Sequence, residues 1–185
     1  MKLQVVAVST RPGRAGFPIA EWAFDAAKRH GAFEATLVDL AAVALPLFDE
    51  PEHPRFGRYQ HEHTKRWSAI VGPADAFVFV TPEYNYSAPP SLINALDYLH
   101  GEWACKPAAF VSYGAAAGGA RSVQMAKVTM TGLKMMPLPE GVLLPFFAKQ
   151  IEGGAFRPNE GNEKAAAAML TELARWAKAL QPLRA

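Results

Sequence analysis

The segment from Phe77 to Ser91 constrains the fold of this chain more than any other. Its first four residues, Phe77 to Val80, are all apolar, which is typical of a short strand buried on both faces of a parallel sheet. Pro82 removes a backbone donor and ends that strand, and the Pro-Pro-Ser sequence at 89–91 favours the start of a helix. A strand therefore leads through a stiff loop into a helix, and open α/β sheets bind their ligands at such carboxyl ends.

The rest of the chain repeats this alternation, which predicts an α/β fold with a parallel sheet. Strands are expected at 3–9, 34–40, 75–81, 107–112 and 142–147, with the short, more polar second strand at an edge of the sheet. Helices are expected at 19–30, 58–71, 91–100 and 162–180, and a further one after the glycine-rich turn 113–119. These elements predict one three-layer, doubly wound domain over 1–185, with strand order 2-1-3-4-5.

The composition sets outer limits on function. Nineteen basic and seventeen acidic residues give a net charge of +2 without a basic cluster, so nucleic-acid binding has no electrostatic support. The only cysteine, Cys105, excludes an intrachain disulfide and suits a reducing compartment. The apolar run after Met1 predicts a strand rather than a secretory signal, and no apolar run reaches membrane-spanning length. We therefore expect a cytoplasmic protein that binds neither nucleic acid nor membrane.

The loop after the first strand, residues 9–16, has the composition of a phosphate site. It carries hydroxyls, two arginines and two glycines directly before a helix. The free amides and the dipole of a helix N-terminus attract an anion, and arginine binds phosphate oxygens. The loop matches neither the GxxxxGK[ST] nor the GxGxxG pattern, so a solvated turn explains it equally well. The missing lysine argues against ATP or GTP hydrolysis.

Two further loops, 82–87 and 112–119, favour a flat ligand. Glycines at 114, 118 and 119 would let a ring lie against the backbone, and Tyr84 and Tyr113 would form its walls. By itself the Gly-Gly pair is equally consistent with a tight turn. With strand order 2-1-3-4-5, however, all three loops meet at the switch point where this fold holds FMN.

These segments resemble the NADPH-dependent FMN reductase family, which has a flavodoxin-like fold and includes small azo, quinone and chromate reductases. The resemblance runs from Gln4 to about Ala148. Its most specific marker is Pro82-Glu83-Tyr84-Asn85, followed by Ser-x-Pro-x-x-Leu-x-Asn-Ala-x-Asp over residues 87–97. The Ser-Tyr-Gly…Gly-Gly segment at 112–119 and Lys106-Pro107 agree with it.

The resemblance implies a set of FMN-binding residues and no catalytic or metal-ligating side chain. The first loop and the start of its helix would hold the phosphate, and the other two loops would surround the isoalloxazine. The residues are Ser9, Arg11, Arg14, Gly16, Phe17, Pro18, Ile19, Pro82, Glu83, Tyr84, Asn85, Ser112, Tyr113, Gly114, Gly118 and Gly119. Val8 stands where the family usually has glycine, and Pro18 lacks an amide, so we expect weaker binding of the phosphate.

The resemblance also implies the reaction. Hydride would pass from NADH or NADPH through FMN to a small-molecule acceptor such as a quinone, a free flavin, an azo compound or a metal oxyanion. Amides of the 114–119 turn and the N-terminus of the next helix would stabilise negative charge on the flavin. Glu83 would order its loop, or form a hydrogen bond near the flavin or across a dimer. Two alternatives stay open. An FMN-binding regulator or electron carrier with little NAD(P)H activity would use the same loops, and a nucleotide-binding module without flavin would be colourless.

Two side observations complete the expectations. His61 and His63 are two residues apart, so on a helix they would point to different sides, and we expect surface residues rather than a zinc pair. Large apolar residues outside the sheet-facing stripe of the helix at 91–100, together with those of the 45–57 loop, predict a homodimer or a pair of dimers. Scattered hydrophobic residues on a monomer are the alternative. The interface residues would be Leu47, Phe48, Phe56, Ile93, Tyr98 and Trp103.

Overall fold

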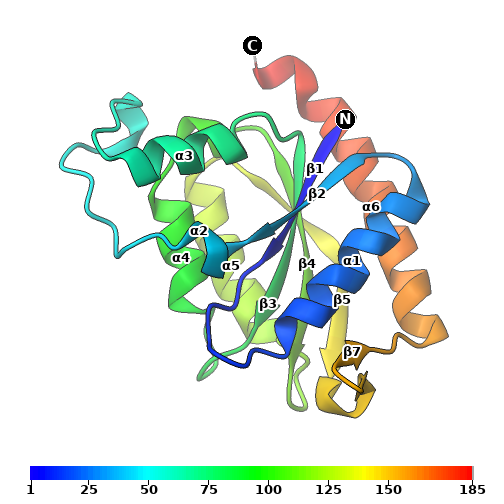
Figure 1. Ribbon diagram of the computed structural model, residues 1–185. Helices are drawn as coiled ribbons and strands as arrows, with labels where there is room; N and C mark the ends of the chain where they lie inside the picture. The colour runs from blue at the N-terminus through cyan, green and yellow to red at the C-terminus, as the bar shows by residue number, and fades with distance from the viewer. Residues whose placement is uncertain (185) are drawn as a thin grey trace.

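The computed structural model describes residues 1–184, and its centre is a five-stranded parallel sheet of order β2-β1-β3-β4-β5 (Figure 1). The strands are β1 Lys2–Ala7, β2 Glu34–Asp39, β3 Ala76–Pro82, β4 Pro107–Gly114 and β5 Met136–Pro145. A separate two-stranded hairpin follows, with β6 Ile151–Glu152 and β7 Ala155–Phe156. The expected strand order is confirmed, with β2 at an edge. Because the strands are parallel, the loops after β1, β3 and β4 lie together where the strands end, at the carboxyl edge of the sheet.

Helices cover both faces of this sheet (Figure 1). One face carries α1 Gly16–His30 and α6 Glu160–Leu180, and the other carries α3 Glu62–Val71, α4 Pro90–Asp97 and α5 Ala120–Gly132. The short helix α2 is Leu40–Val43, and 3-10 turns lie at Pro54–Phe56, Gly101–Trp103, Phe147–Gln150 and Gln181–Arg184. Within residues 1–184, no helix combines the length and the apolar character needed to cross a membrane.

The buried run in β3 packs against both helical layers. Val78 and Val80 belong to the core beneath α1 and α6, whereas Phe77 and Phe79 belong to the core on the side of α3, α4 and α5. All four side chains are at most 1% exposed. Because successive residues of a strand point to opposite faces, a continuous apolar run is what a sheet covered on both sides requires. The predicted three-layer, doubly wound architecture is thereby confirmed.

Two elements, β5 and α3, begin furthest from their expected starts. β5 starts at Met136 rather than at 142. It includes prolines at 137 and 139, which a strand at the edge of a sheet tolerates. α3 starts at Glu62 rather than at 58, since the carboxylate of Glu50 accepts hydrogen bonds from the backbone N–H groups of Gln60 and His61. Side-chain acceptors of this kind compete with helical hydrogen bonds.

Tyr98 and Trp103 are core residues of the single chain, so the prediction that they form an exposed second face is wrong. Both are 0% exposed. Helical spacing no longer applies to them because α4 ends at Asp97. The ring of Trp103 packs 5.0 Å from that of Phe77, and its Nε1 donates to the backbone oxygen of Leu96 (3.1 Å).

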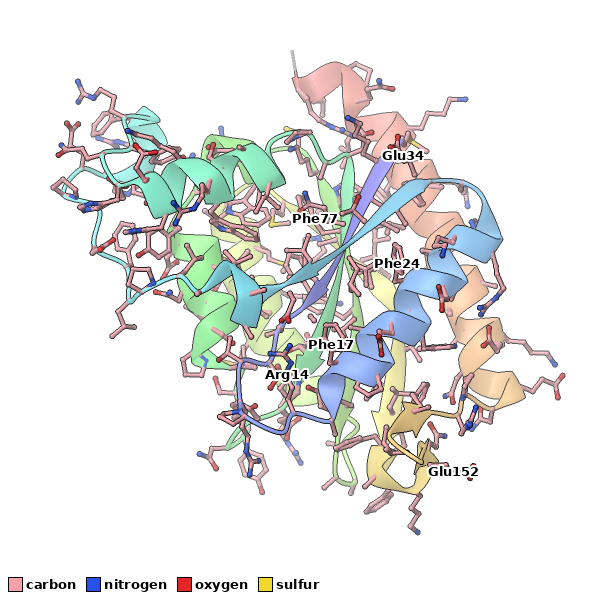
Figure 2. The ribbon with its side chains drawn as sticks, in the orientation of Figure 1. Arg14, Phe17, Phe24, Glu34, Phe77 and Glu152 are labelled. Carbon is pink, nitrogen blue, oxygen red and sulfur yellow. The ribbon has the colours of Figure 1, made fainter. Side chains whose placement is uncertain are left out.

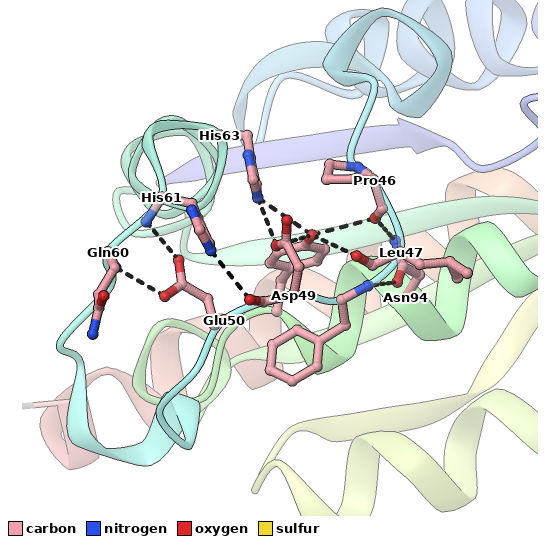
Figure 3. Close-up of polar contacts among 10 residues, drawn as sticks. Pro46, Leu47, Asp49, Glu50, Gln60, His61, His63 and Asn94 are labelled. Atoms are coloured by element: carbon pink, nitrogen blue, oxygen red, sulfur yellow. Dashed lines mark hydrogen bonds and ion pairs between the residues drawn. The ribbon is translucent and has the colours of Figure 1, made fainter.

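The hydroxyl of Tyr98 and the amide of Asn94 hold the long loop between α2 and α3, residues 44–61, which we call the fastened loop (Figure 3). Asn94 accepts a hydrogen bond from the N–H of Phe48 (2.9 Å) and donates one to the oxygen of Pro46 (2.7 Å). The Tyr98 hydroxyl donates to the carboxylate of Asp49 (2.9 Å). The loop is therefore held firmly to the end of α4, although it has little regular structure.

His61 and His63 also form hydrogen bonds to this loop (Figure 3). Nε2 of His63 lies 2.9 Å from Oδ1 of Asp49, and Nε2 of His61 lies 3.1 Å from the backbone oxygen of the same residue. Their rings stack, with centroids 5.1 Å apart. The prediction that they point to different sides is wrong because His61 precedes α3 and does not follow helical spacing.

Candidate functional site

The carboxyl edge of the sheet holds a cavity of about 670 Å³, a size typical of small-molecule sites. It is walled by the predicted loops after β1, β3 and β4 and also by the segment after β5, which the sequence did not indicate. The lining residues are Ser9, Arg11, Pro12, Gly13, Arg14, Ala15, Pro82, Glu83, Tyr84, Tyr113, Gly114, Ala115, Phe146, Phe147, Ala148 and Lys149.

Helix α1 begins beside this cavity with its first amides uncapped. Ala15, the N-cap residue, offers no side-chain acceptor, and the first turn contains no acidic residue. The last turn carries three basic residues, Lys28, Arg29 and His30, as the negative end of a helix dipole favours. Pro18 has no N–H, but the remaining N-terminal amides lack an intrahelical partner and suit an external anion.

The two arginines of the first loop have different surroundings. Arg11 is exposed, and no carboxylate among residues 1–184 lies within ion-pair distance of it. Arg14 is paired with Asp39 at the end of β2, and its guanidinium lies 5.1 Å from the centroid of the Phe17 ring (Figure 2). The charge of Arg14 is thus compensated within the protein, and Arg11 is the arginine available to a ligand.

Val8, which stands where the resembled family has glycine, has an ordinary backbone. Its N–H donates to the oxygen of Val80 (3.1 Å), its side chain is 0% exposed, and its φ is not positive. The backbone conformation at this position therefore does not require glycine.

Tyr113 packs against the start of α1 and contributes little exposed surface to the cavity wall. Its side chain is only 4% exposed, and its ring lies 4.9 Å from that of Phe147. A Cβ at Gly16 would lie 1.9 Å from the Tyr113 hydroxyl oxygen, so a glycine is required there. Burial, with a smaller contribution from Tyr84, raises the pKa of Tyr113. Tyr84 in turn shares a hydrogen bond of 3.0 Å with Ser9, which joins two of the loops.

Glu83 connects the loop after β3 to α5. Its carboxylate accepts hydrogen bonds from the backbone N–H of Arg121 (3.1 Å) and from its guanidinium (2.7 Å). These contacts agree with the expectation that Glu83 orders the loop. A carboxylate therefore accepts from one amide at the N-terminus of α5, the helix end expected to stabilise a negative flavin, and that expectation stays a prediction.

Asn85 lies at the tip of a tight turn and does not line the cavity. Asn85 and Tyr86 have φ angles of 50° and 66°, and Tyr84 and Ser87 exchange backbone hydrogen bonds across them. Two consecutive left-handed residues between paired neighbours are typical of a type I′ turn. Tyr86 is 71% exposed, and the guanidinium of Arg121 lies 4.2 Å from the centroid of its ring.

Other predicted residues also lie behind the cavity wall. The side chain of Ile19 is 0% exposed within the core, so only its backbone could meet a ligand. Ser112 donates a hydrogen bond to the oxygen of Gly118 (2.8 Å). A Cβ at Gly119 would lie 2.8 Å from the Cβ of Ser112, so this glycine lets the turn pack on β4. The predicted residues outside the lining are Gly16, Phe17, Pro18, Ile19, Asn85, Ser112, Gly118 and Gly119.

The strand order and the position of the cavity at the switch point between β1 and β3 define a flavodoxin-like protein. The structure of the flavoenzyme NAD(P)H:(acceptor) oxidoreductase FerB from Paracoccus denitrificans has the same fold. It matches with a TM-score of 0.76 over 96% of this chain and 97% of its own, at 21% sequence identity.

Sequence comparison then gives the family. The model of the NADPH-dependent FMN reductase family matches residues 1–149. The NAD(P)H-dependent FMN reductase ntnL of Nectria sp is 35% identical over 153 residues, which cover 80% of this chain and 76% of that protein. An NAD(P)H-dependent FMN reductase of Schizosaccharomyces pombe is 40% identical over 147 residues, which cover 78% and 74% respectively. The chain therefore belongs to the NADPH-dependent FMN reductase family, and it is an oxidoreductase with FMN and NAD(P)H as its cofactors.

Proposed function

We propose that the cavity at the carboxyl edge binds FMN, and that this one domain passes hydride from NADH or NADPH to a small-molecule acceptor. The observation that carries the proposal is the uncapped start of α1 beside Arg11, at the mouth of a cavity of about 670 Å³. A phosphate needs donors and positive charge, and these residues supply both without any acidic neighbour in the first turn. Bound FMN would supply the hydride-transfer chemistry.

The protein side chains bind and orient in this proposal, and none acts as an acid or a base. Arg11, Ser9 and the first amides of α1 hold the phosphate end. Pro82, Tyr84 and the backbone at Gly114 contact the ring end. Glu83 has a structural role in this proposal, since both of its carboxylate oxygens accept hydrogen bonds from Arg121.

The proposed acceptors are a quinone, a free flavin, an azo compound or a metal oxyanion. What supports a broad range is the lining, whose surface is largely apolar and makes few directional demands on an acceptor. Rates of NADPH oxidation with a member of each class, on the FMN-loaded protein, would rank them. A protein that binds FMN but transfers electrons to none of these classes would contradict the proposed range.

Replacement of Arg11 by alanine tests the phosphate site. Because a charge-assisted contact contributes about 1.5–3 kcal/mol, we expect Arg11→Ala to weaken FMN binding roughly ten- to a hundredfold. Riboflavin, which has no phosphate, should bind the wild-type protein much more weakly than FMN and should be insensitive to the substitution. Flavin fluorescence titration of the apoprotein measures both affinities.

The matched control is Arg66→Ala, which removes an exposed arginine of α3 outside the cavity. It should leave both affinities unchanged. Equal binding of FMN and riboflavin by the wild-type protein would refute the assignment of the first loop as a phosphate site.

We also propose that the protein is a homodimer or a pair of dimers. Support comes from exposed apolar side chains on the fastened loop, where Leu47 is 81%, Phe48 40% and Phe56 50% exposed. Ile93, which is partly buried on the neighbouring helix α4, would join them.

We further propose a cytoplasmic location, which the single cysteine led us to expect. Cell fractionation would test it.

A further inference from the structure

We infer that Lys149 is a second phosphate-binding residue of the cavity, on the side of β5. The inference rests on the proposed function and extends it to a segment that the sequence motifs do not include. The phosphate is either that of FMN or one carried by the nicotinamide dinucleotide, since both ligands must reach the same cavity.

The segment that carries Lys149 is attached directly to the proposed ring-binding loop. The N–H of Phe146 donates to the oxygen of Ala115 (3.1 Å), and the ring of Phe147 packs 4.9 Å from that of Tyr113. Further along the chain, Phe156 of β7 packs 5.1 Å from Trp22 of α1. The segment is thus attached to β4 and, through the hairpin that follows it, to α1 (Figure 1), and it lines the same cavity as Ala15, the N-cap residue of α1.

The backbone of this segment turns sharply at Phe146. Phe146 has φ 49° and ψ 37°, the left-handed conformation that large side chains rarely adopt. The N–H of Lys149 donates to the oxygen of Phe146 (3.0 Å), and its ammonium lies 5.5 Å from the centroid of the Phe146 ring. Strain of this kind is frequent at binding sites, and here it brings a lysine to the cavity wall.

The positive charge of Lys149 has no protein partner. Among residues 1–184, no carboxylate lies within ion-pair distance of it, and the nearby Glu152 is paired with Arg157 (3.9 Å). Arg14 is compensated by Asp39, so the cavity retains two uncompensated cations, Arg11 and Lys149. A phosphate monoester carries about −1.5 to −2 charges near neutral pH, which two cations would balance.

The test compares Lys149→Ala with Lys149→Arg and with Lys178→Ala, an exposed lysine of α6 outside the cavity. FMN and riboflavin are titrated into the apoprotein by flavin fluorescence, and NADP⁺ and NAD⁺ into the FMN-loaded protein by calorimetry. We expect Lys149→Ala to weaken one phosphate-bearing ligand about three- to tenfold, the range for an exposed charge-assisted contact. Lys149→Arg should restore most of that loss, and Lys178→Ala should change nothing.

The pattern identifies the phosphate. A loss for FMN without a loss for riboflavin assigns Lys149 to the FMN phosphate. A loss for NADP⁺ alone assigns it to the 2′-phosphate, and equal losses for NADP⁺ and NAD⁺ assign it to the pyrophosphate. Unchanged affinities, or a loss that includes riboflavin, overturn the inference. Failure of the wild-type protein to prefer FMN over riboflavin would instead refute the proposed function, so the two failures are distinguishable.

Discussion

Gly16 is the first residue of α1, and the hydroxyl of Tyr113 lies directly against it. There is no space between them for a methyl group. The 1.9 Å separation from a Cβ at Gly16 means that any side chain must displace the tyrosine or the helix. The start of α1 carries the amides proposed to bind phosphate. A packing constraint at one residue therefore sets the position of the binding groups.

Replacing Gly16 with alanine should accordingly damage binding and stability together. We expect Gly16→Ala to lower the free energy of unfolding by about 1–3 kcal/mol, as overpacking does, and to weaken FMN binding roughly tenfold or more. Urea unfolding and flavin fluorescence titration measure the two effects.

The control is Gly132→Ala at the end of α5, where an added Cβ would meet nothing within 4 Å and φ is not positive. This substitution should be neutral or slightly stabilising because alanine favours helices. A Gly16→Ala protein with wild-type stability and affinity would contradict the packing argument.

At the scale of elements, single side chains join helices to strands that are distant in sequence. Glu83 connects the end of β3 to the start of α5, and Asn94 of α4 holds the loop that precedes α3. Lys106, next to the start of β4, donates to the backbone oxygens of Val71 (3.3 Å) and Gly72 (2.7 Å) at the end of α3. The Glu83 contact fixes a loop that lines the cavity. The contacts of Asn94 and Lys106 fix loops elsewhere in the layer of α3, α4 and α5.

The stability of the protein should depend on pH through Lys106. The residue is 6% exposed, and its burial lowers the pKa from the ordinary 10.5 to about 8. Between these values the unfolded chain holds a proton that the folded chain has released, so the free energy of unfolding rises with pH. We expect stability in urea to increase from pH 7.5 to 9.5 by an amount on the order of 1 kcal/mol.

Lys106→Met supplies the comparison. It loses the two hydrogen bonds and should be less stable overall, but its stability should no longer rise across this pH range. Parallel pH profiles for the two proteins would show that another group is responsible.

At the scale of the whole molecule, the fastened loop between α2 and α3 presents large apolar side chains to solvent. Its backbone at residues 46–49 is held by Asn94 and Tyr98, so Leu47 and Phe48 are presented in one arrangement (Figure 3). Rigid apolar patches of this kind are typical of association surfaces. The exposure of this loop now carries the dimer proposal, since Tyr98 and Trp103 are buried in the monomer.

Light scattering at micromolar concentration tests this proposal. We expect a mass of at least twice the 20.1 kDa of one chain. Leu47→Asp should reduce that mass, because a buried charge without a partner opposes association. Leu183→Asp, at a 64% exposed leucine outside the loop, should not. A wild-type mass near that of one chain ends the dimer hypothesis.

The sequence alone determined the layered architecture, the strand order and the three loops that line the cavity. Apolar runs such as Phe77 to Val80 record burial on both faces, and that information is local. The polar loops after β1, β3 and β4 were visible because a strand pattern ends directly before each one. The motif at 82–85 then pointed to the family, and the family comparison agrees with it.

Only the tertiary structure decided which of the candidate residues are available. Arg14 is compensated by Asp39, 25 positions away, and Glu83 is bound to Arg121, 38 positions away. The segment at 146–149 enters the cavity because β5 ends earlier than its pattern predicted, and Trp103 is buried because its helix stops before it. Periodicity records which face of an element is apolar. It contains no information on pairs that meet only after the elements have packed, and those pairs set the charge and shape of the site.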